Sequence, residues 1–123
     1  MEIEMTNLSK TWILDLDGTI LKHNGYKLDG KDSLLDGAME LLSQIKGEDM
    51  IIFVTSRKLE YRQMTEDFLK EAKIRFDYII YEAPYGERIL INDDKPSGRK
   101  MAYAFGGKRD EIVDLNIKVN DKL

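Results

Sequence analysis

Acidic side chains stand in two pairs, and the spacing of the first pair suits metal and phosphate chemistry. Asp15 and Asp17 are two residues apart at the end of the short apolar run TWILDL. On an extended strand, residues two apart point to the same side, so these carboxylates lie close together. Close carboxylates attract a divalent cation, or the pKa of one of them rises. The sequence therefore predicts a carboxylate site where this apolar run ends.

The second acidic pair, Asp93 and Asp94, follows the apolar run RILI and precedes Lys95. Taken alone, this pair is equally typical of a solvated turn before Pro96. Ligands that are all carboxylate oxygens favour magnesium over zinc. Together the two pairs predict a Mg²⁺ site whose expected ligands are Asp15, Asp17, Asp93 and Asp94.

The same residues supply the parts of a phosphoryl-transfer site. An aspartate attacks phosphorus only where positive charge and hydroxyl donors offset the repulsion between two anions. We expect Asp15 to be the nucleophile, Asp17 the general acid and then the general base, and Lys95 the fixed cation. Gly18 allows a sharp turn beside the phosphate, where backbone amides also donate hydrogen bonds. The expected phosphate-binding residues are Gly18, Thr55, Ser56 and Arg57.

Ordinary structural roles compete with these assignments. Asp followed by Gly is a common turn pair, and Thr55 is also a suitable helix N-cap. Arg57 and Lys58 are more typical of solvated residues in a first helical turn. His23, the single histidine, lies in a polar loop, where exposure is favoured over substrate contact. The combination of DLDGT with the second acidic pair favours the chemical interpretation.

The elements that must position these residues alternate along the chain. Short apolar runs predict buried strands, and apolar residues three and four apart predict helices. Strands are expected at 11–16, 50–54, 77–81 and 88–91, with an edge strand within 113–119. Helices are expected over 34–45, after Thr55 or Ser56 as far as Ala72, and from Ser97 to Gly106. The segment 18–30 is predicted to be a polar loop or a small hairpin.

This order predicts an α/β fold: a three-layer, Rossmann-like, open and mainly parallel sheet with helices on both faces. Residues 1–123 form one domain of ordinary size. In such sheets ligands bind beyond the carboxyl ends of the strands, which is where three of the apolar runs meet polar residues. The intervals 15–55 and 55–93 are filled by the expected elements, so we expect no cap domain. The loop 18–30, a neighbouring subunit of a homo-oligomer or nothing then shields the site.

Composition narrows the classes of function. The hydrophobic fraction of 42% and the charged fraction of 34% are globular values and exclude a disordered chain. A net charge of −4 does not favour nucleic-acid binding but allows a small phosphate ester as partner. The lack of cysteine excludes a Cys-based zinc site and fits the cytoplasm. The first residues do not resemble a signal peptide, and no apolar run is long enough for a membrane span.

The motifs resemble those of the haloacid dehalogenase (HAD) superfamily over residues 11–105. DLDGTI is similar to its first motif, IIFVT to its second and ILINDD to its fourth. The sequences TSRK, TEDFL and INDDKP are most similar to small capless members associated with capsule or sugar-phosphate metabolism. The resemblance implies a magnesium-dependent phosphatase that forms an aspartyl-phosphate and acts on a small metabolite, with sugar phosphates favoured.

One family motif is missing. The superfamily places a Lys before its last acidic strand, whereas this chain has no Lys between Lys73 and Lys95. Either Lys95 replaces it, or Arg88 reaches in, or catalysis is impaired. Three other functions therefore compete: a phosphatase for nucleic-acid ends or nucleotides, a receiver-like domain and a HAD-like protein that binds without turnover. In receivers the phosphorylated aspartate follows a later strand, which argues against the second of these.

Overall fold

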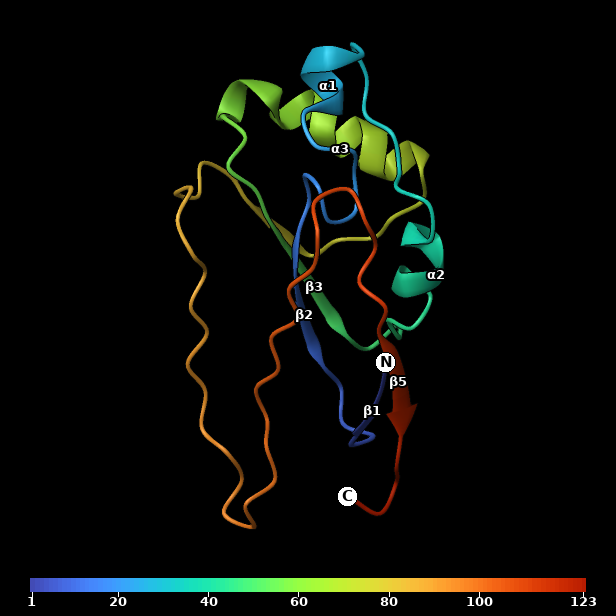
Figure 1. Cartoon of the computed structure of the whole chain (residues 1–123), viewed down its shortest axis with the longest axis vertical. Coiled ribbons are helices and arrows are strands. Elements are labelled where there is room, and N and C mark those ends of the chain that lie inside the picture. The colour runs from blue at the N-terminus through green and yellow to red at the C-terminus, as the bar shows by residue number, and fades with distance from the viewer.

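Two parallel sheets organise the chain in a computed structural model that describes all residues, 1–123. The larger sheet has three strands in the order β2 (Thr11–Asp15), β3 (Met50–Val54) and β4 (Tyr78–Ile80). The smaller sheet pairs β1 (Glu2–Met5) with β5 (Asn116–Val119), so it joins the two ends of the chain (Figure 1). Both sheets are open, and every strand pair in them is parallel.

Three α-helices and one 3₁₀-helix accompany the sheets. These elements are α1 (Gly25–Leu28), α2 (Ala38–Leu42), the 3₁₀-helix η1 (Leu59–Tyr61) and α3 (Arg62–Glu71), which follows η1 directly. The open parallel sheets with their helices confirm the predicted α/β, Rossmann-like fold class. Only these short elements, β3 and β4 lie between residues 15 and 93, with no inserted folded module.

Predicted and observed strands agree where the apolar run is continuous. β3 has the predicted bounds, and β2 and β4 each fall within one residue of theirs at either end. β5 forms within the alternating tail, in register with β1, which the sequence did not reveal. A four-residue strand such as β1 is too short to show a recognisable pattern. Its pairing partner also lies more than 110 residues away, so no local signal reveals the pairing.

Three predictions about elements are wrong. The helix expected over 34–45 is shortened to α2, because Gly37, with φ of +87°, breaks the backbone before Ala38. The helix expected from Ser97 is absent, and residues 97–107 contain no helix. The strand expected at 88–91 is also absent. Residues 84–94 make no backbone–backbone hydrogen bond, and the side chains of Ile89 and Ile91 are 84% and 89% exposed.

The chain after β4 instead makes a long excursion. Figure 1 shows it leaving the end of the sheet near α1, running to the opposite end of the molecule, turning there and returning. The turn is closed by backbone hydrogen bonds from Lys95 to Arg99 and from Gly98 to Lys95. Residues 92–95 are therefore carried away from the carboxyl ends of β2 and β3.

The core lies on one face of the larger sheet. Ile51 and Phe53 of β3 point into it, and the turn after β2 adds Leu16, Ile20 and Leu21, all fully buried. α3 contributes Leu69, α2 contributes Leu41, and the segment before β5 contributes Leu115. Side chains of the opposite face are open to solvent, with Ile13, Tyr78 and Ile80 each more than half exposed. None of the helices combines the length and the apolar character that a membrane span requires.

Asp49 fastens the start of β2 to the start of β3. Its carboxylate is buried and accepts hydrogen bonds from the backbone N–H groups of Lys10 and Lys46 and from the indole of Trp12. Burial alone would raise the pKa of Asp49, but these hydrogen bonds outweigh burial and hold it below its ordinary value. Such a group stabilises the fold above its ordinary pKa and loses that contribution as the pH falls through its lowered pKa.

We predict that Asp49→Asn lowers the free energy of unfolding near neutral pH by about 1–3 kcal/mol, because an amide cannot accept all three hydrogen bonds. The difference from wild type should shrink as the pH falls below about 4, the ordinary pKa of an aspartate, toward the lowered pKa of folded Asp49. Urea unfolding at several pH values measures both effects. Asp121→Asn, at an exposed position near the C-terminus, is the control. Equal unfolding free energies for the two variants would contradict this role of Asp49.

Candidate active site

Asp15 and Asp17 lie at the carboxyl edge of the larger sheet, as predicted. Asp15 is the last residue of β2, and Leu16 between the two aspartates is fully buried. A tight turn follows, in which Gly18 donates to the carbonyl of Leu21 at 2.7 Å and Leu21 donates to that of Leu16 at 2.9 Å. Gly18 has φ of +83°, which favours glycine. The buried leucines thus fix the position of both carboxylates.

Thr55 joins this pair from the end of β3. Its fully buried hydroxyl donates a hydrogen bond to Asp17 Oδ2 at 3.2 Å and accepts one from the backbone N–H of Arg57 at 3.1 Å. Thr55 is therefore not the N-cap of a helix, since the next helical element begins at Leu59. Ser56, the next expected phosphate-binding residue, is half-buried and makes no hydrogen bond through its hydroxyl. The structure brings Thr55 to Asp17 as the sequence predicts.

Asp15 is held by a hydroxyl and a guanidinium. Thr19 Oγ1 donates to its Oδ2 at 2.9 Å, and Arg88 Nη1 donates to its Oδ1 at 2.8 Å. The Asp15 and Arg88 side chains remain 35% and 40% exposed. A pair this open to water is weakly stabilising and can exchange partners with an incoming anion. The structure thus brings a cation to Asp15, and that cation is Arg88.

Arg57 forms the buried centre of the site. Its Nε and Nη2 donate to the two oxygens of Asp17 at 3.1 and 2.8 Å, and its Nη1 and Nη2 donate to those of Asp32 at 2.9 and 2.6 Å. Burial lowers the pKa of Arg57, but the hydrogen bonds and charges of Asp32 and Asp17 raise it well above its ordinary value. The structure therefore shows Arg57 neither as a solvated residue nor with a guanidinium that is free to bind phosphate.

The loop after the first motif is attached to this centre. The ring of Tyr26 in α1 lies 4.0 Å from the guanidinium carbon of Arg57, a distance suited to a cation–π contact. Tyr26 also packs edge-on against Tyr61, with ring centroids 4.8 Å apart. Sequence reasoning identified neither Tyr26 nor Asp32 as a residue of the site. No local pattern reveals that Asp32 pairs with an arginine 25 residues later.

Lys95, Asp93 and Asp94 are not brought to this site. Lys95 lies in the turn at the far end of the excursion, where its neighbour Arg99 donates to the backbone carbonyl of Glu4 in β1 at 2.8 Å. Lys95 makes no ion pair, whereas Arg88 pairs with Asp15. The structure corrects the expectation that Asp93, Asp94 and Lys95 lie beside Asp15. Residues 88–91 do not join the sheet as a strand, so the residues that follow them do not lie at its carboxyl edge.

The expected four-carboxylate magnesium site is therefore not assembled. No group of three or more His, Cys, Asp or Glu side chains in the chain lies close enough together to hold a metal ion. Asp15 and Asp17 are instead neutralised by guanidinium groups. These residues do not fit a metal ligand set as they stand.

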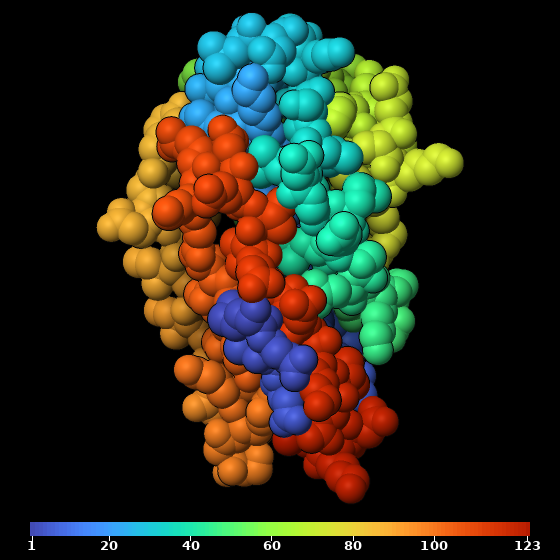
Figure 2. Space-filling model, turned by 45° about the vertical axis from the view of Figure 1, so that its right-hand side comes forward, coloured from blue at the N-terminus to red at the C-terminus, as the bar shows by residue number.

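The C-terminal segment around Asp110 packs against the turn at Gly18, a contact that the sequence did not indicate. Asp110 donates from its backbone N–H to the carbonyl of Gly18 at 2.8 Å, and its Oδ1 accepts the backbone N–H of His23 at 2.7 Å. Figure 2 shows the red-orange segment around residue 110 packed against the light-blue residues around 20–25. His23 is consequently half-buried, and its Nδ1 has no hydrogen-bond partner.

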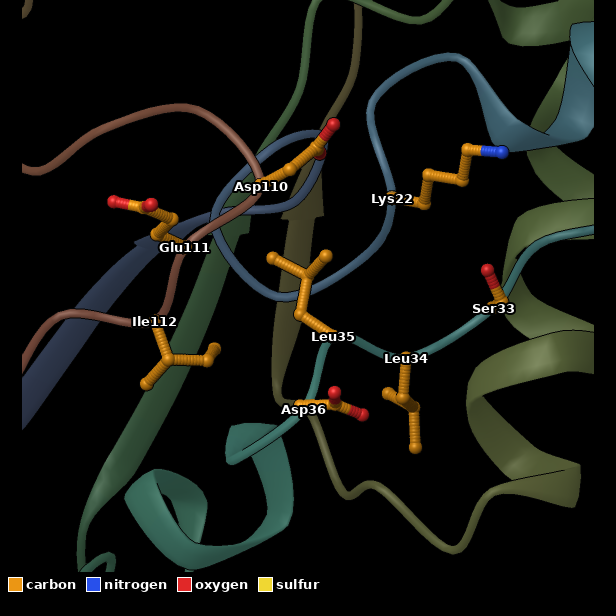
Figure 3. A pocket seen from close by; sticks show the side chains of 8 residues that line it. All are labelled: Lys22, Ser33, Leu34, Leu35, Asp36, Asp110, Glu111 and Ile112. Carbon is orange, nitrogen blue, oxygen red and sulfur yellow. The ribbon is translucent and has the colours of Figure 1, made fainter.

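An open pocket of about 620 Å³ lies beside this segment. In Figure 3, Asp110, Glu111 and Ile112 line one side of the pocket, and residues from Lys22 and the stretch 33–36 line the other. Neither Asp15 nor Asp17 lines it. We therefore place the candidate chemistry at the aspartate pair and not in this pocket.

We predict that Arg57→Met lowers the free energy of unfolding by about 3–5 kcal/mol, because it leaves the carboxylate of Asp32 buried without a counter-charge. Asp32→Asn should lose less, since an amide oxygen still accepts from the guanidinium. Urea unfolding measures both. Arg62→Met, which removes an exposed pair with Glu66, is the matched control and should change stability by less than about 1 kcal/mol. Similar losses for the two arginine variants would refute the central role of Arg57.

Comparisons with known proteins give a structural likeness only. No family model and no curated protein matches the chain. Two solved structures do, one of the Pnkp1/Rnl/Hen1 complex and one of the Pnkp1/Rnl/Hen1 RNA repair complex. In each the matching chain is 28% identical with a TM-score of 0.52, over 69% and 70% of this chain.

The likeness covers a part of each larger chain. The match spans 32% of the first solved chain and 30% of the second, so this protein corresponds to about a third of their length. The chain therefore shares its α/β fold with a portion of proteins that were solved within an RNA repair complex.

Proposed function

We propose that the chain is a phosphoric monoester hydrolase of the HAD type, with Asp15 as its nucleophile. The observation that carries the proposal is the meeting of Asp15, Asp17 and Thr55 at one sheet edge, with a guanidinium on Asp15. The first two motifs of the resemblance thus lie side by side in space. The likeness to chains of an RNA repair complex is consistent with phosphate-ester chemistry.

The reaction would proceed in two displacements. In the first, a carboxylate oxygen of Asp15 bonds to phosphorus while the bond from phosphorus to the ester oxygen breaks, and Asp17, as general acid, gives a proton to the leaving alcohol oxygen. In the second, water attacks the aspartyl-phosphate, phosphate leaves, and the Asp15 carboxylate is restored. Asp17 then accepts the proton of that water as general base. Arg57 and Thr55 orient Asp17 for this step by holding both of its oxygens.

Arg88 would supply the positive charge that the superfamily takes from a lysine. Its guanidinium already lies 2.8 Å from Asp15 Oδ1, on an exposed side of the site where a phosphate can approach. A guanidinium binds phosphate oxygens in pairs, so Arg88 can hold the transferred group while Asp15 attacks. This assigns to Arg88 the part that the sequence pattern gave to Lys95.

Magnesium remains an expectation that rests on the acidic sequence pattern. Because the gathered carboxylates do not form a ligand set, the proposed chemistry gives no step to a metal. Assays with added magnesium and with a chelator measure the dependence directly.

Two substrate classes follow from different observations. A small phosphorylated metabolite, with sugar phosphates favoured, follows from the resemblance and from the net charge of −4. A phosphorylated nucleic-acid end is favoured by the likeness to chains of an RNA repair complex. Salt separates the two, because binding of a polyanion weakens steeply as salt rises, whereas binding of a small ester weakens little.

We predict that Asp15→Asn abolishes phosphatase turnover, by about 1,000-fold or more, because an amide oxygen is not a nucleophile toward phosphorus. The assay is phosphate release from a panel of sugar phosphates and nucleotides, with and without magnesium. Asp114→Asn, at an exposed carboxylate that pairs with the N-terminus, should keep wild-type rates. Near-wild-type turnover by Asp15→Asn would remove this residue from the mechanism.

We predict that Arg88→Met lowers kcat/KM by about 10- to 100-fold, the loss expected for hydrogen bonds from a charged group. Arg88→Lys should restore part of the loss, since it returns the charge but not the paired donors. Lys95→Met, at the distant turn, should change kcat/KM by less than about twofold. A larger effect at Lys95 than at Arg88 would return the role of fixed cation to Lys95.

A further inference from the structure

We propose that Arg109 binds an anionic group of the substrate next to the phosphate that is cleaved. The proposal rests on the phosphatase function above and names its substrate class, the phosphorylated end of an oligonucleotide. In such a substrate a phosphodiester lies one nucleoside away from the terminal phosphate.

Arg109 lies against the turn that carries the two aspartates. Its Cγ is 3.1 Å from the position that a Cβ on Gly18 would occupy, so the stem of Arg109 fills the space a side chain at Gly18 would need. Gly18 directly follows Asp17 in the chain. The guanidinium carbon is three bonds beyond Cγ, so the charge of Arg109 lies within a few bond lengths of this contact with Gly18. Glycine at position 18 thus permits both the turn and the approach of Arg109.

The loop that presents Arg109 is fixed to the site on two sides. Its neighbour Asp110 donates to the carbonyl of Gly18 and accepts from the N–H of His23, at 2.8 and 2.7 Å. Asp110 has a positive φ of 65°, and Glu111 donates back to the carbonyl of Lys108 to close the turn. A cation on an anchored loop loses less entropy on binding than one on a free segment.

Arg109 is the guanidinium near the site that no carboxylate neutralises. Arg57 forms ion pairs with Asp17 and Asp32, and Arg88 forms an ion pair with Asp15. Arg109 is exposed and makes no ion pair, and Lys108 beside it is likewise exposed and unpaired. Three carboxylates thus face two guanidiniums at the centre, so an incoming phosphate requires further positive charge, and this loop provides it.

The position of Arg109 favours a second anionic group over the transferred one. The transferred phosphorus must lie against Asp15, where Arg88 is already in contact. The stem of Arg109 instead lies against Gly18, which stands beyond Asp17 from Asp15 in the chain. An oligonucleotide end presents a phosphodiester at such a neighbouring position, whereas a sugar monophosphate has one phosphate only. The likeness to chains from an RNA repair complex supports the same choice.

The experiment compares two substrates with the same terminal phosphate, of which only the longer one also contains phosphodiesters. The probes are a mononucleotide and a trinucleotide that carries the same terminal phosphate, assayed by phosphate release with wild type and Arg109→Met. We expect Arg109→Met to raise KM for the trinucleotide about tenfold, the loss of one charged phosphate contact, and to affect the mononucleotide much less. The control Lys118→Met removes an exposed, unpaired cation on β5 and should leave both substrates unchanged. Equal effects on the two substrates, or none on either, would overturn the proposal.

A second measurement tests the binding role of Arg109 independently of the proposed phosphatase activity. Binding of a fluorescently labelled trinucleotide with a terminal phosphate is followed by anisotropy over a range of salt concentrations. Arg109→Met should weaken binding and reduce the dependence of log Kd on log salt by about one phosphate contact. If wild type hydrolyses no phosphate ester, the phosphatase proposal fails, and this binding difference still decides the role of Arg109. Identical salt dependence for wild type and Arg109→Met would refute it.

Discussion

The buried guanidinium of Arg57 is the interaction on which the site depends. It joins three parts of the chain: the end of β3, the turn after β2 through Asp17, and the long loop through Asp32. Thr65 of α3 also accepts a hydrogen bond from it at 2.8 Å. Because side chains of Arg57 and Asp32 are almost fully removed from water, each needs the other to offset its desolvation. Removing one partner would therefore disturb the other and, with it, the orientation of Asp17.

The two arginines at the aspartates divide their work by burial. Arg57 holds Asp17 from inside the fold and is closed to any ligand, so its contribution is to orientation. Arg88 meets Asp15 from the solvent side and can change partners when an anion arrives. The same ion-pair chemistry thus serves architecture at one carboxylate and ligand exchange at the other. Both residues are arginines, so the difference in their roles comes from how deeply the surrounding chain buries each side chain.

The sequence was informative where chemistry and local pattern coincide. The positions of Asp15, Asp17 and Thr55 followed from two apolar runs, because parallel strands bring their carboxyl ends to one edge. The roles of Arg57 and Asp32 did not follow, since a charged residue after a strand is ordinarily solvated and its partner lies in a patternless loop. The run RILI has strand-like composition, but a strand exists only when its backbone finds a partner, and that is a long-range property. The placement of Asp93, Asp94 and Lys95 depended on that pairing.

The excursion after β4 also affects how the molecule behaves among its own copies. The outer edges of β2 and β4 in the three-stranded sheet carry unpaired backbone groups. In addition, Ile89, Leu90 and Ile91 form an exposed, apolar and partly β-branched run whose backbone amides make no backbone hydrogen bond. Open edges and such runs are the elements from which intermolecular sheets grow. The charges that flank the run, Arg88 before it and the acidic pair and Lys95 after it, oppose such growth by repulsion and hydration. Asp93, Asp94 and Lys95 therefore favour solubility at the positions where the structure places them.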